Sequence, residues 1–153
     1  MKKKQNTRVI STPVDFAEHI RRVEEYISWN DPVTKLLDRL QNQVEQMGPE
    51  SLSRTARIYL AITEFNDAVF NGCVHLFFSV APQWMQDGVA EGLIELEEHA
   101  LAAEFGQLRR QFREGKLTED TEEDPFFASS FVTNSQDLFS KLDSMAMDQG
   151  LLR

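Results

Sequence analysis

Two pairs of residues have the types and spacing that could perform chemistry. Cys73 and His75 lie two positions apart and combine a thiol with a base, as nucleophilic catalysis requires. Glu95 and His99 lie four positions apart, a spacing at which two side chains of one helix can share a metal ion. Side chains two apart on a helix point to different faces, and two ligands do not complete a metal site. We therefore interpret Cys73 and His75 as buried core residues and Glu95 and His99 as a surface pair.

Motifs that would identify an enzyme are missing from the sequence. The chain has no glycine-rich phosphate loop, no G-x-S-x-G turn and no H-E-x-x-H zinc motif. Its single cysteine excludes an intrachain disulfide and a four-thiolate zinc site. We therefore predict no catalytic residue, no cofactor and no bound metal. The alternative is a small-molecule-binding protein or enzyme, for which a ligand-sized pocket lined by Asn71 and His75 would be the evidence.

The distribution of acidic residues is the most informative pattern in the chain. Between Arg57 and Arg109 there is no lysine or arginine, whereas an ordinary solvated helix mixes both signs of charge. The acidic residues in this interval are Glu64, Asp67, Asp87, Glu91, Glu95, Glu97, Glu98 and Glu104. This asymmetry indicates either a strongly solvated surface or a surface that meets a cationic partner.

Four of these carboxylates are spaced to share one face of a helix. They follow one another at intervals of four, four and three positions, and we call them the carboxylate row: Asp87, Glu91, Glu95 and Glu98. Neighbours in the row stand roughly 5 to 6 Å apart along the helix axis, which is comparable to phosphates along one nucleic-acid strand. Their repulsion costs only a few tenths of a kcal/mol per pair, so a solvated face without function explains the row as well as a binding surface does.

Length and composition predict one acidic domain with a basic arm. The 153 residues carry a net charge of −9, and four of the 16 basic residues, Lys2, Lys3, Lys4 and Arg8, lie in the first 11 positions. We predict a flexible basic arm over residues 1–11 and a single domain over 12–153. No secretion signal precedes the domain, and no apolar run approaches the roughly 20 residues that span a bilayer, so we expect a soluble, cytoplasmic protein without membrane contact. An acidic body also disfavours direct nucleic-acid binding.

Helical periodicity recurs along the whole domain, and strand signals are sparse. We predict helices over residues 12–29, 32–47 and from Ser51 or Ser53 to about 71, then a buried turn or short helix over 73–81. A helix from Pro82 or Asp87 to about Phe105 follows, and Leu108 and Phe112 either continue it or begin another. A solvated acidic loop over 114–124 precedes a last helix from Asn134 or Ser135. The fold class is therefore all-α, a single-domain irregular bundle of about six or seven helices.

One segment resembles a known family. From position 64 the chain reads EFNDAVFNGCVHLFFS, and Glu91 to Leu96 reads EGLIEL. Over about residues 55 to 112 the chain resembles a small all-helical family of unknown function, the DNA-mimic-protein-like family, which includes a bacterial DNA mimic. The residues that carry the resemblance are Asn71, Gly72, His75, Phe77 and Phe78. We interpret them as structural, because Asn-Gly supplies a left-handed helix end and the aromatic residues fill a core.

The resemblance implies a dimeric acidic protein whose carboxylates imitate DNA phosphates. Our first hypothesis is an acidic protein-interaction module, a DNA mimic whose carboxylate row, joined by Glu64 and Asp67, binds the basic surface of a nucleic-acid-binding protein such as a transcription factor. The alternative is an immunity or antitoxin-like protein that neutralises a basic toxin. Long apolar helix faces favour a homodimer, and so do three phenylalanines that we expect to be exposed: Phe126, Phe127 and Phe131.

Overall fold

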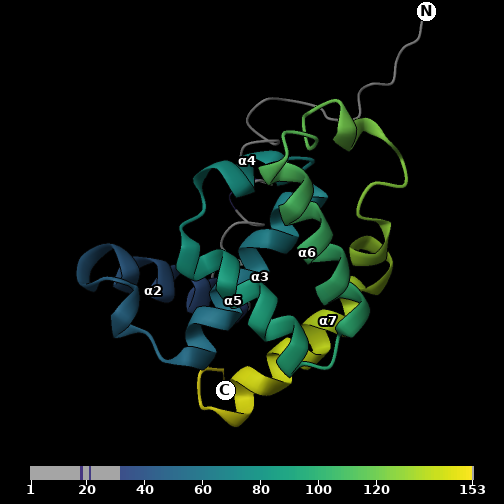
Figure 1. The fold of residues 1–153 in the computed structure, drawn as a ribbon. Helices are drawn as coiled ribbons and strands as arrows, with labels where there is room; N and C mark the ends of the chain where they lie inside the picture. The colour runs from purple at the N-terminus through teal and green to yellow at the C-terminus, as the bar shows by residue number, and fades with distance from the viewer. Residues whose placement is uncertain (1–17, 19–20, 22–31, 153) are drawn as a thin grey trace, which may run out of the picture. The chain divides into compact units, whose positions relative to one another are not determined.

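A computed structural model describes residues 18, 21 and 32–152 of the chain. Its α-helices are α2 (Pro32–Met47), α3 (Arg54–Phe70), α4 (Val74–Val80), α5 (Gln83–Glu95), α6 (His99–Arg113) and α7 (Ser129–Asp148), shown in Figure 1. Single 3-10 turns lie at Pro49–Ser51 and Thr121–Glu123. The described residues contain no strand, so the all-α class is confirmed.

The chain divides within α2 into two compact units, residues 1–38 and 39–153. The helices from α3 onward belong to the second unit. The predicted arm at 1–11 lies outside the described residues, as does the predicted helix at 12–29 apart from Glu18 and Arg21. The predicted single domain over 12–153 stays a prediction. None of the described helices is both long and apolar enough to cross a membrane.

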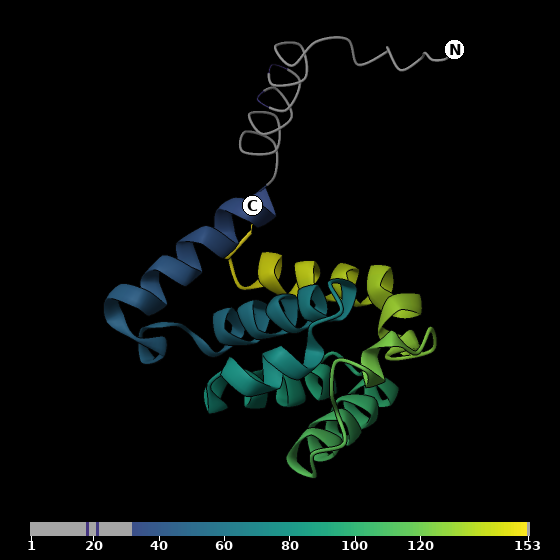
Figure 2. The ribbon, with the colours of Figure 1, turned by 90° about the horizontal axis from the view of Figure 1, so that it is seen from above.

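Helix α3 is the centre of the second unit. Ser53 caps its start, because the serine hydroxyl accepts a hydrogen bond from the Ala56 amide at 3.1 Å. Its middle residues, Tyr59 to Ile62, are almost completely buried, since α5 and α7 pack along it and α4 contacts its end (Figure 2). The Tyr59 hydroxyl still finds a polar partner, the carboxylate of Asp143, at 3.1 Å. Helix α3 is therefore buried on several sides, whereas its periodicity predicts a single buried face.

Helices α3 and α5 approach each other closely through two glycines of α5. A Cβ atom at Gly88 would lie 3.0 Å from the Cβ of Ala61. A Cβ atom at Gly92 would lie 2.5 Å from Ile58 Cγ2 and 2.9 Å from Ile62 Cδ1. Carbon atoms in good contact are about 3.5 to 4.0 Å apart, so this approach depends on the missing side chains.

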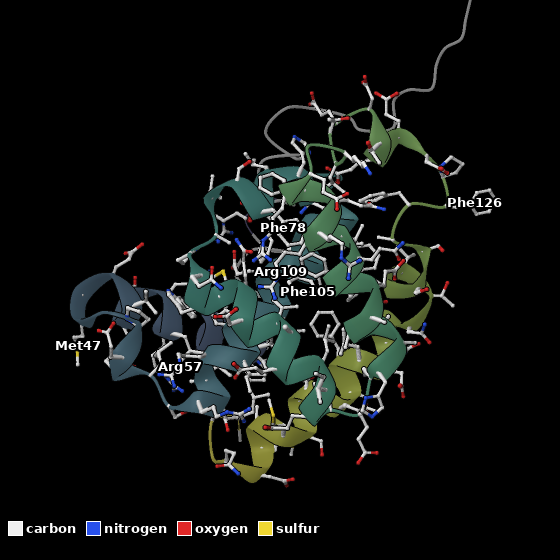
Figure 3. All side chains as sticks on the ribbon, in the orientation of Figure 1. Met47, Arg57, Phe78, Phe105, Arg109 and Phe126 are labelled. Atoms are coloured by element: carbon white, nitrogen blue, oxygen red, sulfur yellow. The ribbon has the colours of Figure 1, made fainter. Side chains whose placement is uncertain are left out.

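An aromatic cluster fills the core between α3, α4, α6 and α7. The ring of Phe65 meets Phe77, Phe105 and Phe131 edge to face, with centroids 5.1, 4.9 and 5.1 Å away. Phe78 adds contacts to Phe65 and Phe105, and Figure 3 shows it beside Phe105 and Arg109. Phe77 and Phe78 are both buried, as a structural role for them requires.

Four helix ends adopt the same hydrogen-bonded terminus, with a left-handed residue one position after the cap. After α3 that residue is Gly72, with φ of 67°, and the next amide, Cys73, donates to the carbonyl of Ala68 at 2.9 Å. The ends of α6 and α7 use Gly115 and Gly150 in the same way. The end of α5 uses Glu97, with φ of 60°, which is a conformation that residues with a side chain seldom adopt.

This left-handed Glu97 makes two of the predicted boundaries wrong. The helix predicted to reach Phe105 ends at Glu95, and α6 begins anew at His99. Ala100, which the single long helix would place in the core, is exposed because the new helix resets the rotation.

The last helix also differs from its prediction. It begins at Ser129, five or more residues before the predicted caps, after a left-handed Ala128. Phe131 therefore lies inside a helix and is buried, while Phe126 is 79% exposed and points away from the helices (Figure 3). Only part of the predicted exposed phenylalanine group thus reaches solvent.

Candidate functional site

The carboxylate row does not lie on one helix. Asp87, Glu91 and Glu95 share a face of α5, with 44, 61 and 40% of each side chain exposed. Glu98 lies beyond the turn at Glu97 and occupies the N-cap position of α6, without a side-chain hydrogen bond to the helix. Its side chain is only 15% exposed, and one of its oxygens lies 3.5 Å from Lys141 Nζ. The predicted row of four is therefore wrong in its last member, and three carboxylates continue along α5.

Cations from other helices approach the remaining row. Arg54 at the start of α3 forms an ion pair with Glu95 and lies 3.7 Å from Glu91. Arg109 on α6 lies 3.3 Å from Asp87. The hydrogen bond to Glu95, followed by the charge of that carboxylate, raises the pKa of Arg54. The gap without cations in the sequence is therefore not a gap in space, and the α5 face has both signs of charge.

Glu64 and Asp67 lie on the second half of α3 and have no such compensation. They are three positions apart, so their side chains are neighbours on one face of the helix. Glu64 accepts a hydrogen bond from the Gln41 amide at 2.8 Å. Within residues 39–152, no lysine or arginine forms an ion pair with either carboxylate. Burial raises the pKa of both groups, and the charge of Asp67 adds to the effect on Glu64.

Beside these two carboxylates the surface is hollowed between α3 and α4. The hollow has a volume of about 210 Å³, and we call it the α3–α4 groove. Its lining consists of Glu64, Asp67, Ala68, Asn71, Cys73, Leu76, Phe77 and Val80. The sequence pattern indicated the two carboxylates but not the groove, because the groove depends on the angle at which α4 leaves the turn at Gly72.

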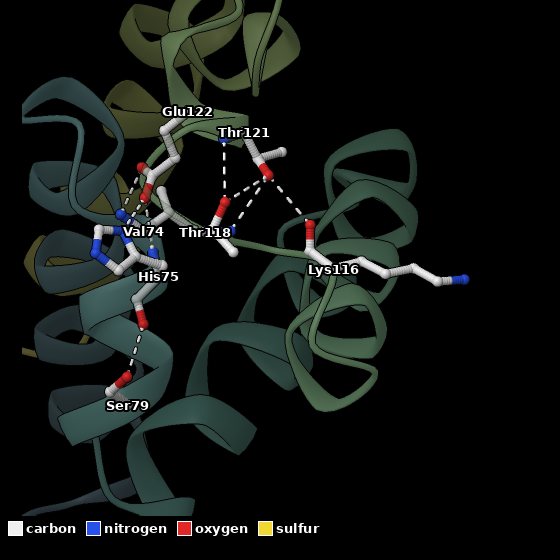
Figure 4. Close-up of polar contacts among 7 residues, drawn as sticks. All are labelled: Val74, His75, Ser79, Lys116, Thr118, Thr121 and Glu122. Atoms are coloured by element: carbon white, nitrogen blue, oxygen red, sulfur yellow. Dashed lines mark hydrogen bonds and ion pairs between the residues drawn. The ribbon is translucent and has the colours of Figure 1, made fainter.

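The residues that carry the resemblance mainly shape this region. The Asn71 side-chain amide donates to the carbonyl of Asp67 at 2.8 Å, and Gly72 supplies the left-handed turn before α4. His75 binds Glu122 through its ring Nδ1 atom (Figure 4). Asn71 is thus the C-cap residue of α3, and Gly72 is the left-handed residue that follows it, as a structural role for both requires.

Glu122 is the residue that sequence reasoning missed. Its two oxygens accept the amides of Val74 at 2.7 Å and His75 at 2.9 Å, besides the imidazole of His75 (Figure 4). The carboxylate thus satisfies free amides at the start of α4, and only 3% of its side chain is exposed. The acidic loop was expected to be fully solvated, which is wrong for this residue. Nothing in the local sequence separates Glu122 from its acidic neighbours.

The same loop is held in shape by a second set of bonds. Thr118 and Thr121 exchange backbone and hydroxyl hydrogen bonds, and the Thr121 hydroxyl donates to the carbonyl of Lys116 at 3.1 Å. The loop is therefore pinned both to itself and to α4 (Figure 4).

The residues first considered for chemistry do not assemble into one site. Cys73 and Asn71 line the α3–α4 groove, whereas His75 borders a different hollow together with Ser79, Phe112, Leu117, Thr118, Glu119 and Asp120. The Ser79 hydroxyl donates to the backbone carbonyl of His75 at 3.1 Å. In the described part of the chain, no three His, Cys, Asp or Glu side chains are placed to hold a metal ion. Asn71 and His75 thus border different hollows, whereas the enzyme alternative requires one pocket that both residues line.

Comparisons of the chain with models of known protein families, with curated proteins and with solved structures each found no match.

Proposed function

We propose that the chain binds a basic protein through carboxylates on α3 and α5. Glu64 and Asp67 form the centre of the binding surface. The observation that carries the proposal is that these two carboxylates lack cationic partners among residues 39–152, although burial already disfavours their charge. A lysine or arginine from another molecule would supply the missing counter-charge. The resulting ion pair would be stronger than an exposed one, because the contact excludes part of the water.

The carboxylates of α5 extend the same surface, because Trp84 of α5 lines both the hollow beside Glu64 and the hollow beside Asp87 and Glu91. Their pairs with Arg54 and Arg109 do not prevent partner binding. Exposed ion pairs are worth only about 0 to 1 kcal/mol each, so a partner's cations can exchange with them at small cost. Glu91 is the most available member, with 61% of its side chain exposed and its Arg54 contact as long as 3.7 Å.

The partner class that fits this surface is a basic nucleic-acid-binding protein. Asp87, Glu91 and Glu95 stand at steps of about 6 Å along α5, comparable to successive phosphates. A protein surface that holds a nucleic-acid backbone presents lysine and arginine at such intervals. This spacing, together with the resemblance over residues 55 to 112, supports the DNA-mimic form of the proposal, with a transcription factor as partner.

The test is affinity capture from a host lysate, with elution by rising salt and identification of the retained proteins. The wild-type chain should retain a basic nucleic-acid-binding protein that elutes as salt rises, because charge pairs are screened. The double variant E64Q/D67N should release it at lower salt, and E91Q/E95Q should do so to a smaller degree. The matched control E119Q/E123Q removes two carboxylates from the acidic loop and should leave elution unchanged.

Addition of duplex DNA distinguishes a DNA mimic from an immunity protein. A DNA mimic competes with DNA for the partner's groove, so DNA should displace the captured protein. Retention of a basic toxin that DNA does not displace would support the immunity alternative. Equal retention by wild type, E64Q/D67N and E91Q/E95Q at physiological salt would refute a binding role for these carboxylates.

A further inference from the structure

The α3–α4 groove has an apolar floor and apolar walls next to Glu64 and Asp67, the two carboxylates without an ion pair among residues 39–152. Ala68 and Phe77 lie at its base and are buried. Leu76 and Val80 are four positions apart on α4, so both project from one side of that helix. They are 50 and 71% exposed, although leucine and valine normally favour burial.

Single exposed apolar residues are common on protein surfaces, but a contiguous apolar patch beside a hollow is typical of a binding surface. Leu76 and Val80 form such a patch, because they line one groove together with Cys73 and the carboxylates of α3. Among the residues that the structure describes, no lysine or arginine lines the groove. The surface is therefore complementary to a segment that presents apolar and cationic side chains together.

We propose that the α3–α4 groove docks a segment of the partner in which apolar side chains lie next to lysine or arginine. The apolar side chains enter between Leu76 and Val80 over Phe77, and the cationic side chains reach Glu64 and Asp67. This is the mode in which an amphipathic segment lays its apolar face into a groove while charges at the rim fix its orientation. The inference rests on the proposed function and names the part of the partner that this surface recognises.

A second copy of the chain fits the groove less well than a basic partner does. A symmetric contact through this surface would bring Glu64 and Asp67 of one copy towards the same residues of the other. Like charges facing each other across an interface oppose association. Charge complementarity therefore favours a cationic segment over self-association.

The probe is a synthetic fluorescent peptide that carries leucines and lysines on one helical face, with binding followed by fluorescence anisotropy. Two matched peptides replace either the leucines by glutamine or the lysines by glutamate. We expect the first peptide to bind and both replacements to weaken binding about tenfold or more, since each removes one of the two recognition elements. In the protein, L76Q/V80Q and E64Q/D67N should each weaken binding to a similar degree. The control V132Q, at an exposed valine of α7, should not.

Cys73 gives an independent readout of the same site. It is the only cysteine of the chain and it lines the groove. Saturating peptide should therefore slow its alkylation in the wild-type protein, and the glutamine-substituted peptide should not. Circular dichroism of each variant checks that the exposed substitutions leave the fold intact.

The outcomes separate the groove from the wider function. If L76Q/V80Q binds the peptide as wild type does while E64Q/D67N loses it, the groove proposal fails and the carboxylate proposal stands. If neither variant changes binding, both fail. Alkylation that bound peptide does not slow also overturns the groove proposal. Loss of a homodimer in L76Q/V80Q, measured by sedimentation without any peptide, would assign the groove to a second copy and overturn the proposed occupant.

Discussion

Substituting Gly92 by alanine tests how closely α3 and α5 approach, and therefore where the α5 carboxylates stand. The new methyl group would lie 2.5 Å from Ile58 Cγ2 and 2.9 Å from Ile62 Cδ1. Ile62 can move the end of its side chain. Ile58 has less freedom, because its Cγ2 is attached directly to Cβ, its rotamer is restricted in a helix, and the residue is 1% exposed. Relief must come mainly from separation of the two helices.

The expected magnitude follows from two opposing terms. Forcing an extra methyl group into a packed core costs about 1 to 3 kcal/mol, and the stiffness of Ile58 places this case in the upper part of that range. Replacing glycine by alanine inside a helix stabilises the folded state by about 1 kcal/mol through helix propensity. The free energy of unfolding should therefore fall by about 1 to 2 kcal/mol, or about 2 to 8 °C in melting temperature for a chain of this size.

Gly106 provides the matched control, because it lies within α6 and a Cβ atom there would meet nothing within 4 Å. Gly106→Ala should raise the free energy of unfolding by about 0.5 to 1 kcal/mol through helix propensity alone. Both variants are measured by urea and thermal denaturation with far-UV circular dichroism. The reasoning is refuted if Gly92→Ala is as stable as the wild type or more stable while Gly106→Ala shows its gain, since α3 and α5 would then have room for the methyl group.

Three further predictions concern single side chains. Glu97→Gly should raise the free energy of unfolding by about 0.5 to 1 kcal/mol in thermal melts, since glycine adopts the left-handed turn without strain; no gain would show that Glu97 is unstrained. Glu122→Gln should lower it by about 1 to 3 kcal/mol and speed hydrogen exchange at Val74 and His75, whereas its exposed neighbour Glu123→Gln should change it little; equal effects would contradict the capping role. Burial raises the pKa of Glu104, so the folded state holds that proton more tightly and loses stability as pH rises from the unfolded-state pKa to the folded-state pKa. Glu104→Gln should therefore be more stable than wild type at neutral pH and equal to it in acid, and a difference that does not depend on pH would refute this assignment.

Helix starts and stops were predictable where one residue decides them locally. Gly48 and Pro49 end α2, Ser53 caps α3, and Gly72 ends α3 in the left-handed conformation. Each of these residues acts through its own backbone preference or its own side-chain oxygen, so the signal is present in the sequence. The short helix α4 was predicted on a different ground, because its segment is almost wholly apolar and a lone strand there would have no strand to pair with.

The boundary between α5 and α6 could not be predicted in this way. Its left-handed position holds Glu97 where the other helix ends hold glycine, and glutamate is an ordinary helix former. The helix ends there because α6 turns back and packs against α5, which the two halves of one straight helix could not do. Tertiary packing therefore overrides the local preference, at the cost of one strained residue.

Charge compensation also depends on tertiary structure. For this reason the candidate site centres on the carboxylates of α3 and not on the predicted carboxylate row. Arg54, Arg109 and Lys141 reach the predicted row from three different helices, and no sequence spacing relates them to it. Glu64 and Asp67 face α4, whose seven residues include no lysine or arginine. A helix without cations cannot neutralise its neighbours, and its exposed Leu76 and Val80 give a partner an apolar surface to cover. The composition of α4 thus produces both halves of the proposed recognition, and Leu76→Lys should weaken binding of the leucine–lysine peptide more than Leu76→Gln, because it adds a cation beside the carboxylates.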